Sequence, residues 1–209
     1  MLESIFSPVL FATAFTTILV IQDPLGAIPI FLTLTGRQED ADRRRSAAQA
    51  TLVSFWVILV FALFGRYILQ FLGISVPALQ VSGGLLLLLV ALELLTDGDE
   101  EAAPSSSSTN TALVPLGTPL LAGPGAIVAA MVAVESAETP VVGWVTVALA
   151  LLATHVVVWA SLRYSVGLHR VLGDTAIRVL TRILGLLLAA IAVQMMGDGL
   201  VSFIKVSFL

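Results

Sequence analysis

The sequence contains no cysteine and few charged residues, and both absences narrow the class of protein. Without cysteine, neither a disulfide framework nor a thiolate metal site can form. Charged residues make up only 11% of the 209 residues, whereas 58% are hydrophobic, and the mean hydropathy is +1.03. A soluble globular protein does not bury that much apolar surface. The composition therefore predicts an integral membrane protein whose surroundings are a lipid bilayer.

Features of several other classes are also missing. The net charge is only −4 and identifies no charged partner, so we expect no nucleic acid among the partners. The first residues, Met1 to Phe6, lack the basic region and small-residue cleavage site of a secretory signal, so we expect the first span to be retained. Neither a cysteine nucleophile nor a metal-ligand cluster is apparent, so we expect no enzyme activity and no cofactor.

Six apolar stretches are long enough to cross a bilayer. About 20 apolar residues are needed for a transmembrane helix, and in hydrocarbon every backbone amide must be paired, which favours helices over alternating barrel strands. The sequence thus predicts an all-α, polytopic bundle. The expected spans are Ser4–Leu34, Ser46–Gln70, Ile74–Thr96, Leu113–Val134, Val141–Leu162 and Ile183–Ile204.

The chain divides near its midpoint. Residues 97–110 are acidic and serine-rich and cannot bury apolar surface, so they are expected to form a flexible linker. This gives a first three-helix unit over residues 1–96 and a second over 111–209. The oligomeric state stays open, with a homo-oligomer as one alternative.

Basic residues gather on one side of the six-span arrangement. Eight of the ten fall in the connections after spans one and five, and only Arg66 and Lys205 fall on the other side. By the positive-inside rule, both termini should be outside the cell membrane and the central linker cytoplasmic. The eight residues are Arg37, Arg43, Arg44, Arg45, Arg163, Arg170, Arg178 and Arg182.

The two halves resemble each other in sequence. The stretch GLLLLLVALELLTDG at 84–98 aligns with GLLLAAIAVQMMGDG at 185–199, with seven of fifteen positions identical. Gly26-Ala-Ile28 also pairs with Gly125-Ala-Ile127 in the same order. Because each unit has three spans, the second copy must enter the membrane upside down. The pattern predicts two inverted repeats, an architecture typical of alternating-access carriers.

Helices one and four are predicted to be broken. QDPLGAIP at 22–29 and PLGTPLLAGPGAI at 115–127 each combine proline and glycine, which remove a helix donor and loosen the backbone. Ordinary proline kinks are the alternative. A break exposes backbone amides at the next half-helix, and near Gly26 and Gly125 these amides would favour a carboxylate. The sequence thus predicts a central site for a small polar solute.

Asp23 is the strongest candidate for a functional residue, because placing a carboxylate within a transmembrane span costs about 2.5 to 3.5 kcal/mol. Three functional roles are open: binding a substrate ammonium, coordinating Na⁺, or carrying a coupling proton. The structural alternative is that Asp23 caps the helix beginning at Pro24. The second repeat has Ala122-Gly123 at this place, so an ion or proton role would be asymmetric.

Other polar residues within the spans carry weaker signals. His155 can take part in proton coupling or simply pack in the bundle. Gln22, Thr118, Gln80 and Gln194 can line a cavity or join helices by hydrogen bonds.

The motifs at 22–31 (QDPLGAIPIF), 73–86 and 115–127 resemble the MarC family of prokaryotic inner-membrane proteins. The resemblance covers nearly the whole chain apart from the linker. It implies a relation to LysE-type amino-acid exporters and ion-coupled transport, by H⁺ or Na⁺, of small neutral amino acids. The residues that match the motifs are Asp23, Pro24, Gly26 and Pro29, with Gly123, Pro124 and Gly125.

These observations together predict a secondary transporter of a small-molecule substrate. Half-helix amides near Gly26 and Gly125 would take a carboxylate, while Asp23 would take an ammonium group or the coupling cation. A passive channel for small solutes and a non-transporting membrane homeostasis protein are the alternatives.

Overall fold

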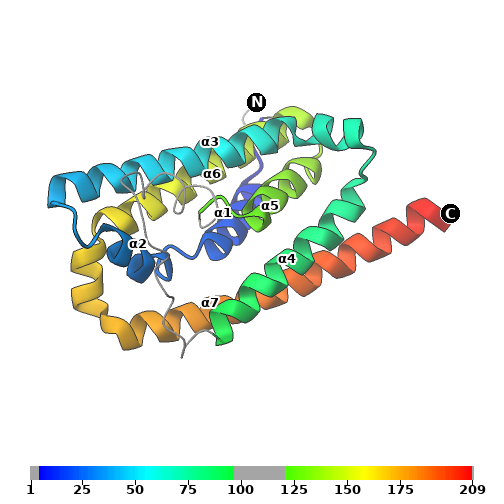
Figure 1. Ribbon diagram of the computed structural model, residues 1–209. Coiled ribbons are helices and arrows are strands. Elements are labelled where there is room, and N and C mark those ends of the chain that lie inside the picture. Colours follow the sequence, from blue (N-terminus) through cyan, green and yellow to red (C-terminus); the bar gives the residue numbers. More distant parts are fainter. Residues whose placement is uncertain (1–4, 97–120, 209) are drawn as a thin grey trace.

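The protein is all-helical over residues 5–96 and 121–208, which are the residues that the computed structural model describes. Within these ranges there is no strand, and seven helices follow one another along the chain (Figure 1). They are α1 (Pro8–Gln22), α2 (Ala27–Thr35), α3 (Asp40–Leu72), α4 (Val76–Thr96), α5 (Pro124–Glu135), α6 (Pro140–Arg163) and α7 (Ser165–Phe208).

Four of these helices are long and apolar enough to cross a membrane. They contain the candidate spans Asp40–Gly65, Val76–Thr96, Pro140–Arg163 and Ser165–Lys205. Helices α1 and α2 add a fifth if they are counted as one bent span. The chain is therefore a multi-pass membrane helical protein. The predicted span Leu113–Val134 is described only in its second part, where α5 is a short apolar helix, so the number six stays a prediction.

The predicted break in the first span is confirmed. Helix α1 ends at Gln22, α2 begins at Ala27, and their axes differ by 49°. In the second half, residues 121–123 are not helical and α5 begins at Pro124. The linker 97–110 and Thr118 lie outside the described residues.

Local sequence signals account for several helix ends. Ser7 and Thr139 are N-caps whose side chains accept from Leu10 N and Val142 N, and each is followed by a proline at the first helical position. Gly73 ends α3 in the left-handed conformation at φ 66°. These local signals fix where α1 and α6 begin and where α3 ends.

The segment before the predicted sixth span is helical rather than a loop. The sequence predicted a span beginning at Ile183, whereas α7 begins at Ser165 and is interrupted by Gly173, whose φ of 70° is left-handed. The chain between α6 and this kink thus forms a short helix. Its eight residues, SVGLHRVL, include a serine, a glycine and the adjacent His169 and Arg170, so it lacks the uniform hydrophobicity of a span.

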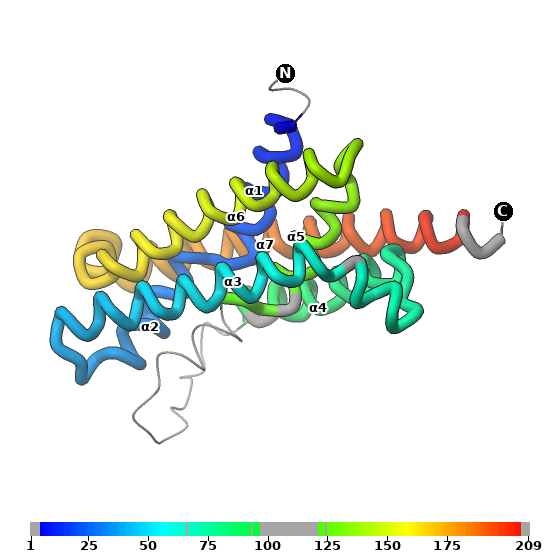
Figure 2. The backbone as a smooth tube through the Cα atoms, turned by 90° about the horizontal axis from the view of Figure 1, so that it is seen from above, coloured from blue at the N-terminus to red at the C-terminus, as the bar shows by residue number. Residues whose placement is uncertain are grey.

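Two antiparallel helix pairs form the frame of the molecule. Figure 1 shows α3 and α6 running in opposite directions, and α4 and α7 doing the same. The broken helix α1/α2 and helix α5 lie between these pairs (Figures 1 and 2). In both views the connection between α2 and α3 lies at the same end as the corner between α6 and α7.

Small residues allow the close approach of α4 and α7. A Cβ atom on Gly84 would lie 2.5 Å from Met196 Cγ and 2.8 Å from Ala192 O. A Cβ on Gly185 would lie 3.4 Å from Ala91 O. Close contact of helix backbones at small residues is a common source of packing energy in membranes, where lipid is as apolar as the helix surface.

Candidate functional site

The first break begins at Asp23, which ends α1 in a left-handed conformation with φ 35° and ψ 70°. Its backbone N–H still bonds back to Leu19 O and Val20 O at 3.2 and 3.3 Å. A non-glycine residue in this region is uncommon and persists only where the surroundings hold it. The turn 24–26 follows, and Ala27 N then donates to Asp23 O at 3.0 Å.

The Asp23 carboxylate is buried, with 5% of the residue exposed, and its two oxygens differ. Oδ1 accepts a hydrogen bond from Gly26 N at 3.0 Å, across the turn that leads into α2. The capping alternative differs in detail from the structure, because no helix begins at Pro24: Asp23 is the C-cap of α1, and Gly26 is the N-cap of α2. Oδ2 has no hydrogen-bond partner of good geometry. A Cβ on Gly26 would lie 2.1 Å from Asp23 Oδ2 and 3.1 Å from Thr181 Oγ1. Asp23 Oδ2 and Thr181 Oγ1 therefore lie on the same side of the Gly26 backbone.

Gln22, one residue before Asp23, is the centre of a buried polar network. Its Nε2 donates to Leu121 O at 2.8 Å and lies 3.3 Å from both Ser54 Oγ and His155 Nε2. Ser54 Oγ lies 3.2 Å from His155 Nε2. Gln22 Oε1 has no partner, although only 3% of the residue is exposed. A buried amide oxygen left unpaired is costly, and marks a place where a polar guest would be stabilised.

In its neutral form, His155 has a suitable hydrogen-bond partner at each ring nitrogen. Its Nδ1 lies 2.8 Å from Leu151 O, which can only accept, so Nδ1 carries the proton. Nε2 is then an acceptor for the Ser54 hydroxyl, and Ser54 Oγ accepts from Gln22. The ring of Phe55 meets the imidazole edge to face at 5.4 Å between centroids. His155 is thus placed by four neighbouring groups on α1, α3 and α6.

The second break meets the first at this network. Leu121, whose carbonyl accepts from Gln22, comes just before the start of α5, where Gly123 is the N-cap without a side-chain hydrogen bond. A Cβ on Gly125 would lie 2.1 Å from Leu87 Cδ2 and 3.6 Å from Ile21 Cγ2. A side chain at position 125 would therefore displace the Leu87 side chain of α4.

The predicted site residues are brought together in part. Gln22 and His155 are in contact, Gly123 is the N-cap at the second break, and Gly125 in the first turn of α5 lies near Ile21. The Asp23 carboxylate, in contrast, faces Thr181 on α7 and not His155.

Two details differ from the predictions made for individual residues of the first motif. The N–H of Gly26 is bonded to Asp23, so in this conformation it does not offer itself to a substrate carboxylate. Pro29 does not extend the break, because it lies in the first turn of α2, where a missing N–H costs little. Pro24 lies in the turn between the two helices.

Three groups of the site were not predicted: Ser54, Thr181 and the carbonyl of Leu121. A serine or threonine in an apolar span bonds to its own helix as often as to a neighbour, so its presence in a sequence carries little signal. Among the described residues no cluster of three or more His, Asp or Glu side chains could hold a metal ion. Na⁺ near Asp23 stays a prediction.

A cavity of about 510 Å³, with a mainly apolar wall that includes several polar side chains, opens between α1, α4, α5 and α7. The predicted cavity residues Gln80 and Gln194 are both in its wall, and Gln194 donates to Asp198 at 2.9 Å. Thr13, Thr17 and Ser136 add hydroxyl groups. The cavity is large enough for a small solute. Its wall includes residues of α1, the helix that precedes the first break.

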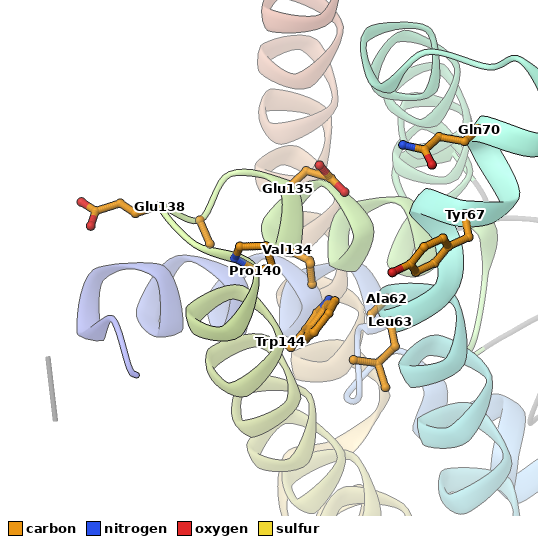
Figure 3. A pocket seen from close by; sticks show the side chains of 10 residues that line it. Ala62, Leu63, Tyr67, Gln70, Val134, Glu135, Glu138, Pro140 and Trp144 are labelled. Carbon is orange, nitrogen blue, oxygen red and sulfur yellow. The ribbon is translucent and has the colours of Figure 1, made fainter. Parts of the chain in front are cut away.

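A second cavity of about 490 Å³ lies between the end of α3 and the α5–α6 connection. In Figure 3, Tyr67 projects from α3 toward Trp144 of α6, whereas Glu138 points away from both. This cavity contains none of the break residues, so it is separate from the polar network.

Comparison with known proteins places the chain in a family. A family model described as "MarC family integral membrane protein" matches residues 9–204. A UPF0056 membrane protein of Methanocaldococcus jannaschii is 39% identical over 91% of this chain and 95% of its own length. The UPF0056 inner membrane protein MarC of Citrobacter koseri is 31% identical over 90% and 92%, respectively. No solved structure matches. The chain therefore belongs to the MarC family of integral membrane proteins.

Proposed function

We propose that this protein is a secondary transporter that moves small neutral amino acids by alternating access, coupled to H⁺ or Na⁺. The observation that carries the proposal is the meeting of two chain breaks at the buried network of Gln22, Ser54 and His155. Non-helical backbone at such depth is tolerated only inside a protein or beside a wet cavity. In carriers, such breaks hold the substrate and the coupling ion.

The proposal includes an inverted repeat of six spans. Reciprocal contacts support it: Gly84 lies against Ala192, and Gly185 lies against Ala91. The offset between the halves is 101 positions in both comparisons, since 185 follows 84 and 192 follows 91 by that number. A two-fold axis relating the halves makes such exchanged contacts.

Contacts between helices follow the same symmetry. With α3 equivalent to α6, α4 to α7 and α2 to α5, the pairs α3–α6 and α4–α7 map onto themselves and are antiparallel. The contact of α3 with α5 corresponds to that of α6 with α2, and α4 with α5 corresponds to α7 with α2. An axis in the membrane plane accounts for all of these relationships, and carriers built this way rock one part against the other.

The site would hold a zwitterion between the two breaks. The N–H of Gly125 at the start of α5, where Gly123 provides no side-chain cap, would take the carboxylate; Pro124 has no N–H, and Ala126 N donates to Gly123 O at 3.1 Å. Asp23 Oδ2, which lacks a partner, would take the ammonium or the coupling cation, with Thr181 beside it. Gln22 Oε1 would accept a further substrate N–H.

The orientation in the membrane is part of the proposal. Arg43, Arg44 and Arg45 lie at the start of α3 and Arg163 lies at the end of α6, at the end of the molecule where these two antiparallel helices meet. With that end cytoplasmic, the positive-inside rule is satisfied. Both termini would then be outside, and the linker 97–110 would be cytoplasmic.

Counterflow in proteoliposomes tests the function. Vesicles loaded with unlabelled glycine, alanine or serine should accumulate the same labelled amino acid, and an imposed proton or sodium gradient should change the accumulation. Asp23→Asn should abolish the response to the gradient, whereas Asp42→Asn, which removes an exposed acid from the first turn of α3, should not.

Each alternative function has its own outcome in this assay. Flux that follows only the solute gradient would favour a passive channel. If no amino acid moves under any gradient, although the protein is folded in the vesicles, the transport proposal is wrong for these substrates. If Asp23→Asn leaves gradient-driven transport unchanged, the coupling role assigned to Asp23 is wrong.

A further inference from the structure

An apolar groove of about 320 Å³ lies along the outside of the α3–α6 pair. Its walls are lipid-facing side chains, with Trp56 58% exposed, Leu52 57% and Val156 55%. His155 and Trp159 also line it. In a bilayer, a concave apolar surface of this kind faces acyl chains rather than water.

Basic residues stand at one end of this groove. Arg163 follows Val156 by seven residues and Trp159 by four, so the three share one face of α6. The Arg163 guanidinium lies 5.2 Å from the centroid of the Trp159 ring and 5.9 Å from that of Tyr164. Arg163 is therefore held over the aromatic end of the groove.

Helix α3 brings two more arginines to the same end. Arg44 and Arg45 precede the groove residue Ala48 by about one turn, so they flank the groove face of α3. Both are exposed, whereas the neighbouring Arg43 is bonded to Asp40 at 3.0 Å. Because α3 and α6 are antiparallel, the start of α3 lies beside the end of α6 (Figure 1).

We propose that this groove is a binding site for one anionic phospholipid. The phosphate lies at Arg163 together with Arg44 and Arg45, and one acyl chain lies along Leu52, Trp56 and Val156. Guanidinium groups bind phosphate oxygens through paired N–H donors. Basic pockets between transmembrane helices recognise anionic headgroups, and tryptophan is favoured at the level of the headgroups.

A bound chain would have a definite effect on the polar network. The His155 ring lies at the floor of the groove, while its Nε2 lies 3.2 Å from Ser54 Oγ inside the protein. Only 4% of His155 is exposed. An acyl chain bound in the groove would cover the His155 ring, which separates the polar network from the outside of the α3–α6 pair. The bound lipid would therefore shield the network of Gln22, Ser54 and His155 from the surrounding bilayer. This inference stands independently of any transport activity.

The three tryptophans of the chain provide the test, because Trp56 and Trp159 line the groove and Trp144 does not. In Trp144→Phe, all tryptophan fluorescence comes from the groove. The protein is reconstituted in phosphatidylcholine vesicles with increasing mole fractions of phosphatidylglycerol brominated at the middle of the acyl chains. Saturable quenching at a low mole fraction is expected, whereas brominated phosphatidylcholine should quench only in proportion to its amount.

Charge variants then locate the headgroup. Arg163→Gln, and separately the double variant Arg44→Gln with Arg45→Gln, should weaken the apparent affinity about fivefold or more, the effect of a basic residue near an anionic lipid surface. Arg170→Gln is the matched control, because Arg170 is exposed on the short helix before Gly173 and is not part of the groove wall. The double variant leaves the Arg163–Trp159 contact in place, so it separates loss of charge from disturbed packing.

Two results of these titrations would overturn the proposal, and a competition experiment provides a third. One is equal, non-saturating quenching by both brominated lipids, which would show ordinary surrounding lipid only. The other is an unchanged affinity in both arginine variants. Glycerol 3-phosphate, which has the phosphate without the chain, should not reverse the quenching; if it did, the site would bind a soluble phosphate instead.

Discussion

Gln22 Nε2 donates a 2.8 Å hydrogen bond to the carbonyl oxygen of Leu121, and this bond joins the last residue of α1 to the second break. The two residues are 99 positions apart in the sequence. Both are buried, so neither the amide nor the carbonyl can find water as a substitute partner. The bond therefore fixes the two breaks against each other and holds the described conformation together.

Removing this bond should destabilise the protein. Gln22→Leu keeps the volume but leaves the Leu121 carbonyl buried and unpaired, and we expect a loss of about 1 to 2 kcal/mol. Thermal or SDS unfolding of the purified protein in micelles measures it. Gln194→Leu is the control, because Gln194 is exposed and bonds only along its own helix to Asp198. Equal stability of the two variants would contradict the structural role of Gln22.

Alanine at Gly84 and at Gly197 should change stability in opposite directions. In a helix, Gly→Ala alone is favourable by about 1 kcal/mol. At Gly197 nothing lies within 4 Å of the added Cβ, so the gain should be seen. At Gly84 the Cβ would lie 2.8 Å from Ala192 O, and overpacking of about 1 to 3 kcal/mol should outweigh the gain. Unfolding midpoints that shift in the same direction would contradict the close approach of α4 and α7.

The network predicts one tautomer of His155. Since Leu151 O can only accept, the neutral ring should carry its proton on Nδ1, with Nε2 accepting from Ser54. The chain has two histidines, so His169→Asn leaves His155 as the only ¹⁵N-imidazole signal. The ¹⁵N spectrum should show the Nδ1-protonated form, and Ser54→Ala should shift the Nε2 resonance. A ring protonated on Nε2 would contradict the network.

The elements that the sequence predicted are those with local causes. The break at 23–26 follows from Asp-Pro and Gly in a stretch too long for one straight helix, and α3, α4 and α6 follow from continuous apolar runs.

The elements that were missed depend on distant parts of the chain. Ser54 belongs to the site only because α3 packs beside α6 and the first break, and Thr181 only because α7 crosses near Gly26. The helix at 165–172 was missed because it is short and contains His169 and Arg170, which lower the hydropathy that identifies a span. Its end at Gly173 is explained by a left-handed φ, which the presence of glycine alone does not establish.

The inverted arrangement can be tested at two glutamates. Glu39 is the residue before α3 and Glu138 comes two residues before α6; both are exposed, and they occupy corresponding places in the two halves. The chain has no native cysteine, so Glu39→Cys and Glu138→Cys each introduce one labelling site. The two substitutions remove the same charge and should be equally tolerated.

A membrane-impermeant maleimide applied to intact cells should then label Glu138→Cys and not Glu39→Cys. The physical reason is that the connection at Glu39 lies beside Arg43, Arg44 and Arg45, whose charge favours the cytoplasmic side. Both cysteines should react once the membrane is permeabilised, which controls for burial. Labelling of both from outside would contradict the inverted repeat, because the α2–α3 and α5–α6 connections would then share one side. Labelling of Glu39→Cys alone would preserve the repeat but reverse the proposed orientation.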